Sequence, residues 1–342
     1  MNTHGGRLIR LAGPPYEIGF AMGQHMGTRL EANIARYIRE RAPDLSQERG
    51  WRSGALPWLR TLPQRYQDEF AGLAGGSGLP LQRVAEWPFV EVRAASGCTS
   101  AMVTLKGHVW VARNNDYALP DLWGYAAIKE ITGRIPTLTF GMEGDVFSGT
   151  GINREHLWLH YHYLPATEPS PDAALPCYVW MTEALETCGT LADVEHLLAA
   201  TPRDGAMLLF AVDGKRDERA VFECGHETSR RLEDSGAWLA GTNHSESMPD
   251  ADDGPLSSVR RLARMDALVH ALVPGRSHRH STPAADLIPI LADDGIERRG
   301  EDGCTVYANV ACPATGMLWY TFGGYPAASR GRWEWLAWPW SD

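Results

Sequence analysis

The residues ASGCTS at 95–100, followed by VWVARNND at 109–116, decide the fold of this chain. Between the two segments lie a short apolar run and the dipeptide Lys106-Gly107, which has the composition of a turn. Alternating apolar runs joined in this way predict a β-hairpin, with its first strand beginning at Cys98. The end of the second strand then folds back beside the start of the first. The hairpin therefore brings the Cys98 thiol, the Arg113 guanidinium and the Asp116 carboxylate together.

The Gly-Cys-Thr sequence and the Arg-Asn-Asn-Asp sequence after it resemble the cysteine N-terminal-nucleophile (Ntn) hydrolases. The resemblance is nearest to the acyl-CoA:6-aminopenicillanic acid acyltransferases, which are the self-processing C45 peptidases. It extends more distantly to bile salt hydrolases and penicillin V acylases. The pattern YEIGFAMG at residues 16–23 is also similar to the N-terminal segment of the C45-like proteins. Short motifs of this kind identify a superfamily and leave the substrate open.

The resemblance implies both a fold and a route of activation. It implies self-cleavage at the Gly97-Cys98 bond, which divides the chain into a mainly helical N-terminal pro-segment (1–97) and a catalytic domain (98–342). It implies an α+β fold for that domain, the four-layer αββα sandwich of Ntn hydrolases. The new N-terminal cysteine would use its own α-amine as the general base.

The composition is that of a globular protein. The chain has 342 residues, of which 44% are hydrophobic and 22% charged, and its net charge is −10. A nucleic-acid partner would need a basic face, and basic residues cluster only around residues 260–264. No apolar run approaches the 18 residues of a membrane span, and residues 1–10 lack the apolar core of a signal peptide. We therefore expect a cytoplasmic protein with no nucleic-acid or membrane partner.

The six cysteines are widely spaced and include no CxxC pair, which argues against a zinc ribbon or a redox motif. Free cysteines are typical of a reducing compartment, where a reactive Cys98 can persist. A second Gly-Cys-Thr sequence occurs at residues 303–305. Cleavage there would leave only residues 304–342, too few for a catalytic domain, so we interpret Cys304 as a core strand residue.

The N-terminal region predicts one long helix over residues 16–41. Apolar residues recur in it every four positions from Ile18 to Ile38 and form a stripe. Glycines at 19, 23 and 27 follow the same spacing, which indicates close approach by another backbone. The stripe predicts that the two fragments stay associated after cleavage. Further on, the sequence GGSG at 75–78 reads as a flexible joint.

The part after Cys98 alternates between strand and helix patterns, as expected of sheets covered by helices. Strands are predicted near 126–132, 136–140, 157–163, 207–212, 220–224, 238–241, 304–310 and 317–322, with an edge strand in the Trp-rich tail at 331–338. Helices are predicted at 178–188, 190–200, 257–272 and 284–291. Residues 120–125 are predicted as a loop, and 149–153 as a Gly-rich turn.

Cys98 is the candidate nucleophile. A thiol attacks as its thiolate and needs a base or a nearby cation. An α-amine, with an ordinary pKa of about 7.7–8.0, can serve as that base near neutral pH. Self-cleavage would begin as an N→S acyl shift, and Gly97 places no Cβ in its way. The alternative is a buried, unreactive cysteine at a strand start.

The resemblance assigns supporting roles to three further residues. Asp116 is expected to orient the α-ammonium or the thiol proton, and Arg113 to lower the thiol pKa or bind a substrate oxygen. Asn243, in the sequence AGTNH at a predicted strand end, is the candidate oxyanion donor. The alternatives are a surface ion pair for Asp116 and Arg113, and a turn residue for Asn243.

The predicted helix start SSVRR at 257–261 is similar to a family segment in which an arginine supports the site. The sequence does not choose between Arg260 and Arg261. We expect the apolar face of this helix to run from Val259 through Leu262 and Met265.

A histidine-rich strand, with His156, His160 and His162, raises the question of a metal site. No carboxylate completes a ligand set at suitable spacing, so we expect neither a metal nor another cofactor. Rough alignment with the family places His162 and Tyr163 near the acyl pocket. Trp123 and Tyr125 are further candidates for its lining, with aromatic core packing as the alternative for all of them.

These interpretations predict an enzyme that transfers an acyl group from a small-molecule amide or acyl donor through a Cys98 thioester. The donor could be a secondary metabolite or an acyl-CoA. With water as acceptor the protein is an amidohydrolase, which we favour, and with an amine it is an N-acyltransferase. The alternatives are an uncut binding protein on the same fold and a conventional Cys–His hydrolase using His244 or His162. The sequence leaves homo-oligomerisation open.

Overall fold

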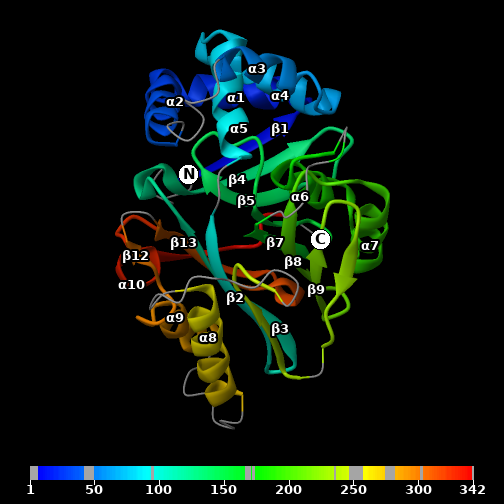
Figure 1. Ribbon diagram of the computed structural model, residues 1–342, viewed down its shortest axis with the longest axis vertical. Coiled ribbons are helices and arrows are strands. Elements are labelled where there is room, and N and C mark those ends of the chain that lie inside the picture. Colours follow the sequence, from blue (N-terminus) through cyan, green and yellow to red (C-terminus); the bar gives the residue numbers. More distant parts are fainter. Residues whose placement is uncertain are drawn as a thin grey trace.

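A computed structural model describes residues 7–41, 50–93, 96–165, 171, 174–234, 236–245, 257–273, 282–300 and 303–340 of the chain. Two β-sheets lie face to face, with helices outside them, and the helices of the N-terminal segment cover one end (Figure 1). In the described part of the chain, no helix is both long enough and apolar enough to span a bilayer.

Both sheets mix sequence-distant strands. The first sheet has the order β1 (Leu8–Gly13), β4 (Trp123–Ile131), β5 (Thr137–Met142), β6 (Thr150–Asn153), β7 (Leu157–Leu164), β8 (Ala206–Asp213), β9 (Glu218–Cys224) and β10 (Ser229–Arg231). The second has the order β11 (Trp238–Gly241), β2 (Gly97–Leu105), β3 (His108–Tyr117), β13 (Gly303–Cys312), β14 (Met317–Phe322) and β15 (Arg332–Leu336), with β12 (Arg299–Gly300) paired to β13.

The helices form two groups. Those of the N-terminal segment are α1 (Pro15–Met26), α2 (Thr28–Arg41), α3 (Trp51–Leu59), α4 (Gln64–Ser77) and α5 (Leu81–Glu91). Those of the part after Cys98 are α6 (Cys177–Thr187), α7 (Leu191–Ala200), α8 (Ser258–Leu272), α9 (Ala284–Leu291) and α10 (Ala327–Arg330).

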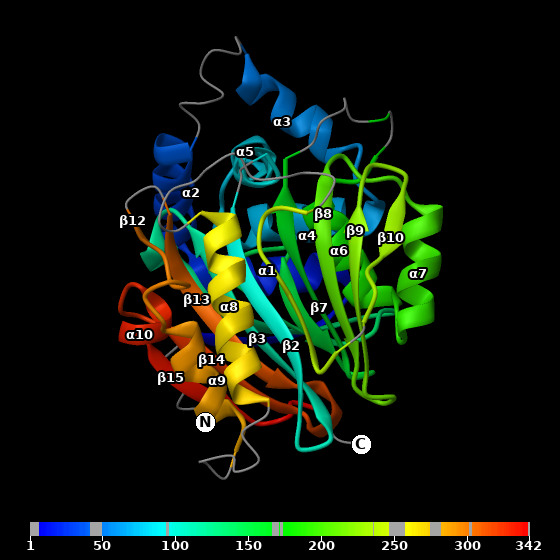
Figure 2. The ribbon, with the colours of Figure 1, turned by 60° about the horizontal axis from the view of Figure 1, so that its bottom comes forward.

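Alternation along the strands produces four layers. Val103 of β2 packs against Met265 of α8, whereas its neighbour Met102 points the other way, into the core between the sheets. On the far side, Leu159 of β7 packs against Leu185 of α6. Figure 2 shows α8 and α7 on opposite sides of the stacked sheets. The order helix, sheet, sheet, helix is the αββα sandwich, so the predicted fold class is confirmed.

The predicted hairpin is present as β2 and β3. Cys98 pairs with Asn115, and Gly97 with Asp116. The turn residues Lys106 and Gly107 have φ values of 52° and 84°, as a two-residue hairpin turn requires. Because β2 begins at Gly97 and lies between β11 and β3, Cys98 is the second residue of a strand inside the second sheet.

The single helix predicted over 16–41 is wrong, because the chain breaks at Gly27 into α1 and α2. Gly27 has a φ of 54°, and its N–H bonds back to the carbonyl of Gly23 and ends α1. The apolar stripe survives the break, since α2 resumes in the same phase. Every member of the stripe is buried: Ile18, Met22, Met26, Leu30, Ile34 and Ile38.

The glycines of α1 pack against α4 as predicted, with Gly27 excepted. A Cβ on Gly19 would lie 1.9 Å from the carbonyl oxygen of Glu69, and one on Gly72 would lie 2.0 Å from that of Tyr16. The backbones of α1 and α4 are thus in contact. The predicted joint at 75–78 is wrong: 75–77 complete α4, and Gly78, with a φ of 75°, follows it in the left-handed conformation.

The N-terminal segment also joins the sheets formed by the part after Cys98. Its β1 pairs in parallel with β4 at the edge of the first sheet. Nearby, Arg65 of α4 forms ion pairs with Glu69 of the same helix and with Glu186 of α6. Lys129 of β4 donates to Glu69 at 2.7 Å. All four side chains are buried. An ion network therefore joins the segments before and after Cys98.

Three smaller predictions were wrong in detail. The expected loop at 120–125 is a short 3₁₀ turn followed by the first residues of β4. The expected turn at 149–153 is mostly strand β6. Helix α8 buries Ser258, Arg261, Met265 and Val269, whereas Val259, predicted to be buried, is exposed.

Candidate active site

Cys98 lies at the start of β2 with its side chain fully buried. Arg113 of the facing strand β3 donates from Nη2 to Cys98 Sγ at 3.3 Å, and the thiol faces Asn115 Oδ1 at 3.6 Å. Burial raises the pKa of the thiol above its ordinary value, and the Arg113 charge acts in the opposite direction. The uncut chain therefore holds a protonated thiol against a guanidinium.

The Arg113 guanidinium is buried and organises the floor of the site. It donates from Nη2 to the carbonyl of Tyr161 and to Asn115 Oδ1, each at 3.1 Å, and from Nη1 to the Tyr307 hydroxyl at 3.2 Å. These oxygens are all uncharged, so the positive charge is not neutralised at its own contacts. Such a cation stabilises a thiolate or an oxyanion formed next to it.

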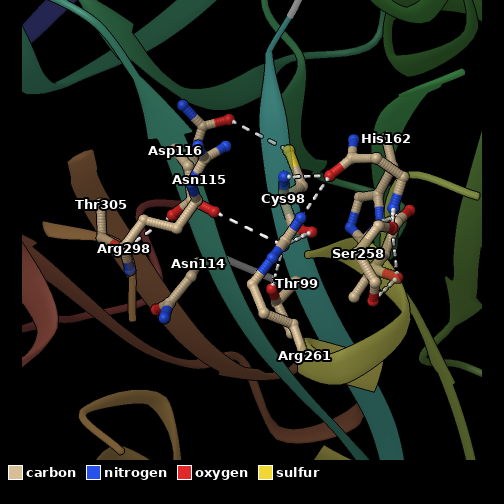
Figure 3. Close-up of polar contacts among 12 residues, drawn as sticks. Cys98, Thr99, Asn114, Asn115, Asp116, His162, Ser258, Arg261, Arg298 and Thr305 are labelled. Carbon is tan, nitrogen blue, oxygen red and sulfur yellow. Dashed lines mark hydrogen bonds and ion pairs between the residues drawn. The ribbon is translucent and has the colours of Figure 1, made fainter. Parts of the chain in front are cut away.

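Asp116 lies beside the peptide bond before Cys98 rather than at the sulfur. Its Oδ1 accepts from the Thr305 hydroxyl at 2.6 Å, and its Oδ2 is 3.6 Å from Arg261 Nη1 (Figure 3). It is the cross-strand partner of Gly97, and a Cβ on Gly97 would lie only 3.2 Å from the Asp116 Cβ. Glycine is the one residue type that fits at position 97 without displacing the Asp116 side chain.

Asn243 follows β11 and binds the backbone of Cys98. Its Oδ1 accepts from the Cys98 N–H at 2.7 Å. Its Nδ2 donates to the carbonyls of Tyr163 at 2.9 Å and Ser96 at 3.3 Å. The Ser258 hydroxyl in turn contacts the Asn243 N–H at 2.7 Å. The side-chain amide therefore spans the Gly97-Cys98 peptide from one side.

The structure places Arg261, and not Arg260, at the site. Arg261 is buried at the start of α8 and donates from Nη1 to the Cys98 carbonyl and to the Thr99 hydroxyl, each at 2.6 Å. Its Nη2 reaches Asn243 Oδ1 at 3.2 Å. Arg260 is exposed on the other face of α8.

His160, His162 and His244 form their hydrogen bonds away from the Cys98 sulfur. The Ser100 hydroxyl lies between His160 Nε2, at 2.9 Å, and His162 Nε2, at 2.8 Å. Burial, followed by the Arg113 charge, lowers the pKa of both well below the ordinary value, so both are neutral. His244 contacts Ser258. Among the described residues no histidine nitrogen bonds the Cys98 sulfur, and no histidine, cysteine and carboxylate group has the arrangement of a metal site.

A cavity lies beside the buried thiol, bounded by the groups that hold Cys98 Sγ and by aromatic side chains. Its lining residues are Glu91, Ser96, Arg113, Asn115, Tyr117, Trp123, Gly149, Tyr161, Tyr178 and Tyr307.

Of the four residues predicted to bind substrate, only Trp123 lines this cavity. Tyr125 lines a different cavity, formed with Arg7 and α1. His162 is buried under Ser100, and Tyr163 meets the site through its backbone carbonyl. Strand alternation explains the difference, because Tyr161 points to the opposite face of β7 from His160 and His162.

Comparison of the sequence with models of known protein families finds a match to one family. Residues 103–280, more than half of the chain, match the family of acyl-coenzyme A:6-aminopenicillanic acid acyl-transferase. No curated protein matches the chain significantly in sequence.

Several solved structures are similar in fold at low identity. A mutant of the conjugated bile acid hydrolase from Clostridium perfringens is 14% identical (TM-score 0.47) over 70% of this chain and 96% of that chain. Penicillin V acylase from Agrobacterium tumefaciens is 13% identical (TM-score 0.48) over 70% of this chain and 86% of that chain. The Caenorhabditis elegans orthologue of N-acylethanolamine-hydrolyzing acid amidase is 16% identical (TM-score 0.47) over 64% of this chain and 93% of that chain.

The family match begins within β2, five residues after Cys98, and runs through β3, Asn243 and Arg261. It thus includes most of the residues gathered around the buried thiol. The chain belongs to the acyl-coenzyme A:6-aminopenicillanic acid acyl-transferase family.

Proposed function

We propose that the protein is a self-processing cysteine Ntn enzyme that transfers the acyl group of a small-molecule amide to water through a Cys98 thioester. One observation carries the proposal. The Cys98 sulfur contacts the Arg113 guanidinium, while the Cys98 N–H binds Asn243. The nucleophile and the future α-amine are therefore both held before any cut is made.

Self-cleavage would start at the Gly97-Cys98 peptide. The Cys98 sulfur adds to the Gly97 carbonyl carbon, and collapse of the tetrahedral species breaks the C–N bond. Gly97 is then a thioester on Cys98, whose nitrogen has become an amine. Water hydrolyses the thioester, which leaves a Gly97 carboxylate and a free thiol. Asp116, the cross-strand partner of Gly97, is placed to hold a proton during this exchange.

Cleavage would change what Asn243 can bind. In the uncut chain its Nδ2 donates to the Ser96 carbonyl at 3.3 Å. Once the 96–97 end is released, that N–H is available for the oxyanion that forms on a substrate carbonyl. Arg261 holds Asn243 Oδ1 and the Cys98 carbonyl at the same time, so the amide keeps its orientation. One such donor is worth about 10²–10³ in rate.

In the mature enzyme the α-amine of Cys98 would take the thiol proton, and Arg113 would stabilise the thiolate beside it. The sulfur adds to the substrate carbonyl, and the amide nitrogen leaves with the proton carried by the α-ammonium. Water then hydrolyses the thioester. An amine in place of water would make the protein an N-acyltransferase, the type of activity for which the family is named.

We also propose that the pro-segment (1–97) remains bound to the catalytic domain (98–342). The pairing of β1 with β4 and the buried network around Arg65 support this, since both cross the cleavage point. The pro-segment therefore stays as a structural subunit.

Alkylation of the processed protein tests the proposal. Iodoacetamide adds one carbamidomethyl group to an accessible thiolate, and we expect it to modify Cys98 first. The rate of hydrolysis of acyl p-nitroanilides should fall in proportion to the fraction of Cys98 that is modified. The matched control is Cys304→Ala, which removes the other Gly-Cys-Thr cysteine and should retain activity. Full activity after complete modification of Cys98 would contradict the nucleophile assignment and favour a binding protein.

A further inference from the structure

The cavity beside Cys98 contains an acid that the proposed mechanism does not use. Glu91 ends α5 in the pro-segment, is only 8% exposed, and lines the cavity together with Arg113. Its Oε1 is buried and has no hydrogen-bond partner among the described residues. A buried carboxyl oxygen without a partner is costly in an empty site and is relieved by a ligand that supplies a donor.

Among the described residues, the groups that act on the Glu91 carboxyl include no cation. Tyr178 hydrogen-bonds this carboxyl, and the same hydroxyl lies 3.4 Å from Asp145 Oδ2, so a second acid stands behind the first. Burial, followed by the Asp145 charge, raises the pKa of Glu91 well above its ordinary range. Arg113 lines the same cavity but forms no ion pair with Glu91 in the described structure. One wall therefore carries a carboxyl that keeps its proton while the cavity is empty, and the wall at the nucleophile carries the Arg113 guanidinium.

The remaining walls are aromatic. They are formed by Tyr117, Trp123, Tyr161, Tyr178 and Tyr307. Aromatic rings around a carboxyl group attract an alkylammonium, because the face of such a ring carries partial negative charge. An anionic group would meet the Glu91 carboxyl, and a plain alkyl chain would leave Glu91 Oε1 unpaired.

The precursor shows which half of a substrate enters this cavity. In self-cleavage the acyl group passed to Cys98 belongs to the segment that ends in Ser96 and Gly97. Ser96 lines the cavity and accepts from Asn243 Nδ2. The cavity thus holds the acyl side of the first bond to be cut, and after release of that end the acyl half of a substrate takes its place.

Resting on the proposed function, we infer that Glu91 makes the enzyme selective for amides whose acyl half carries an amine. The acyl carbonyl would lie at Cys98 and Arg113, and the ammonium would lie among the rings against Glu91. The pro-segment then contributes a specificity-determining residue and has a role that outlasts activation.

Matched anilides test the inference in the processed protein. The p-nitroanilide of 6-aminohexanoic acid and that of heptanoic acid differ only in an ammonium against a methyl group, and shorter and longer pairs scan the chain length. We expect kcat/KM to favour the amino chain by about tenfold or more at the best length, as one buried cation–π and ion-pair contact implies. Glu91→Gln should lower this ratio by about tenfold. The ratio is taken within one protein, so a loss of folded material cancels.

The control variant is Glu130→Gln, which removes an acid of β4 that pairs with Arg10 at the surface and should leave the ratio unchanged. An equal or higher kcat/KM for the heptanoyl chain at every length, or a ratio unaffected by Glu91→Gln, would overturn the inference while leaving the proposed function intact.

A binding measurement separates the two proposals. Calorimetry with 6-aminohexanoate and heptanoate reports on the cavity without any chemistry. Tighter binding of the amino acid, lost in Glu91→Gln, with no anilide hydrolysed would support the role of Glu91 and refute the enzyme. Equal binding of both acids would refute the role of Glu91 whatever the activity.

Discussion

Arg261 donates to the backbone carbonyl of Cys98 at 2.6 Å, from a helix that begins 160 residues further along the chain. The same side chain holds Thr99 and Asn243, and its Nη1 lies 3.6 Å from Asp116. One buried cation thus fixes the strand that carries the thiol, the amide that binds the Cys98 N–H, and the carboxylate beside Gly97.

Removal of Arg261 should therefore slow self-cleavage. Arg261→Ala leaves Asp116 buried without its cation and lets Asn243 turn, so we expect processing to fall by about 10² in rate. Arg260→Ala, one residue away on the exposed face, should cut at the wild-type rate. The two fragments are quantified by denaturing electrophoresis over time after synthesis. Equal rates in both variants would mean that Arg261 only stabilises α8.

The buried network between α4 and α6 should keep the fragments together. Glu186→Gln leaves the Arg65 guanidinium buried with one partner fewer, and we expect a loss of about 3–5 kcal/mol in the free energy of unfolding. Size-exclusion chromatography should show the 1–97 and 98–342 fragments eluting together in the wild type and separating at lower urea in the variant.

The control for the network is Glu195→Gln, which removes an exposed ion pair with Arg231 and should cost at most about 1 kcal/mol. Separation of the wild-type fragments in the absence of denaturant would contradict the structural role given to the pro-segment.

The contact between α1 and α4 predicts opposite effects for two neighbouring glycines. A Cβ on Gly72 would lie 2.0 Å from the Tyr16 carbonyl oxygen, so Gly72→Ala should destabilise the protein by about 1–3 kcal/mol. The new Cβ in Gly75→Ala meets the hydroxyl end of the half-exposed Tyr16 side chain at 3.0 Å and the Phe20 ring at an ordinary contact distance of 3.5 Å. The variant gains helix propensity, by about 1 kcal/mol at most. Urea unfolding in the Cys98→Ala background measures both on one chain. A destabilised Gly75→Ala alone would reverse the expected order.

Asp145 should make stability fall as the pH rises. Burial raises the pKa of this carboxyl to about 7, from an ordinary value of about 3.8, although the Met142 N–H and Lys129 act in the opposite direction. Between these values the folded state keeps a proton that the unfolded chain has lost, so the free energy of unfolding falls as the pH rises from about 4 to 7.

The variant Asp145→Asn stays neutral at every pH and should flatten that dependence. We expect the wild-type Tm to drop between pH 5 and pH 8 by several degrees more than the variant's, measured by differential scanning calorimetry. The control is Asp121→Asn, because Arg36 lowers the pKa of that exposed carboxyl and its titration lies below this window. Parallel curves for wild type and Asp145→Asn would exclude Asp145 as the source.

The local elements could be predicted from the sequence because their causes are local. The hairpin follows from alternation around Lys106-Gly107, and the cross-strand position of Arg113 and Asp116 follows from the hairpin. The arrangement of these strands as an αββα sandwich rested on the resemblance to a family. Periodicity misread residues 16–41 because the apolar stripe keeps its phase across the Gly27 break.

The choice between Arg260 and Arg261 depended on which face of α8 is buried, and that face carries Ser258 and Arg261 as well as apolar residues. The apolar stripe predicted from Val259 is centred on a different face of the helix, because Val259 itself is exposed. Glu91 and Tyr307 reach the cavity from α5 and β13, which only the tertiary fold brings together. No short sequence signal marks either of them.

Intact mass spectrometry of the purified wild type beside Cys98→Ala and Cys304→Ala tests the central claim most directly. We predict two species from the wild type and from Cys304→Ala, with the larger beginning at Cys98, and one uncut species from Cys98→Ala. A single uncut chain from the wild type, or a cut at another bond, would remove the free α-amine of Cys98 and contradict the Ntn mechanism.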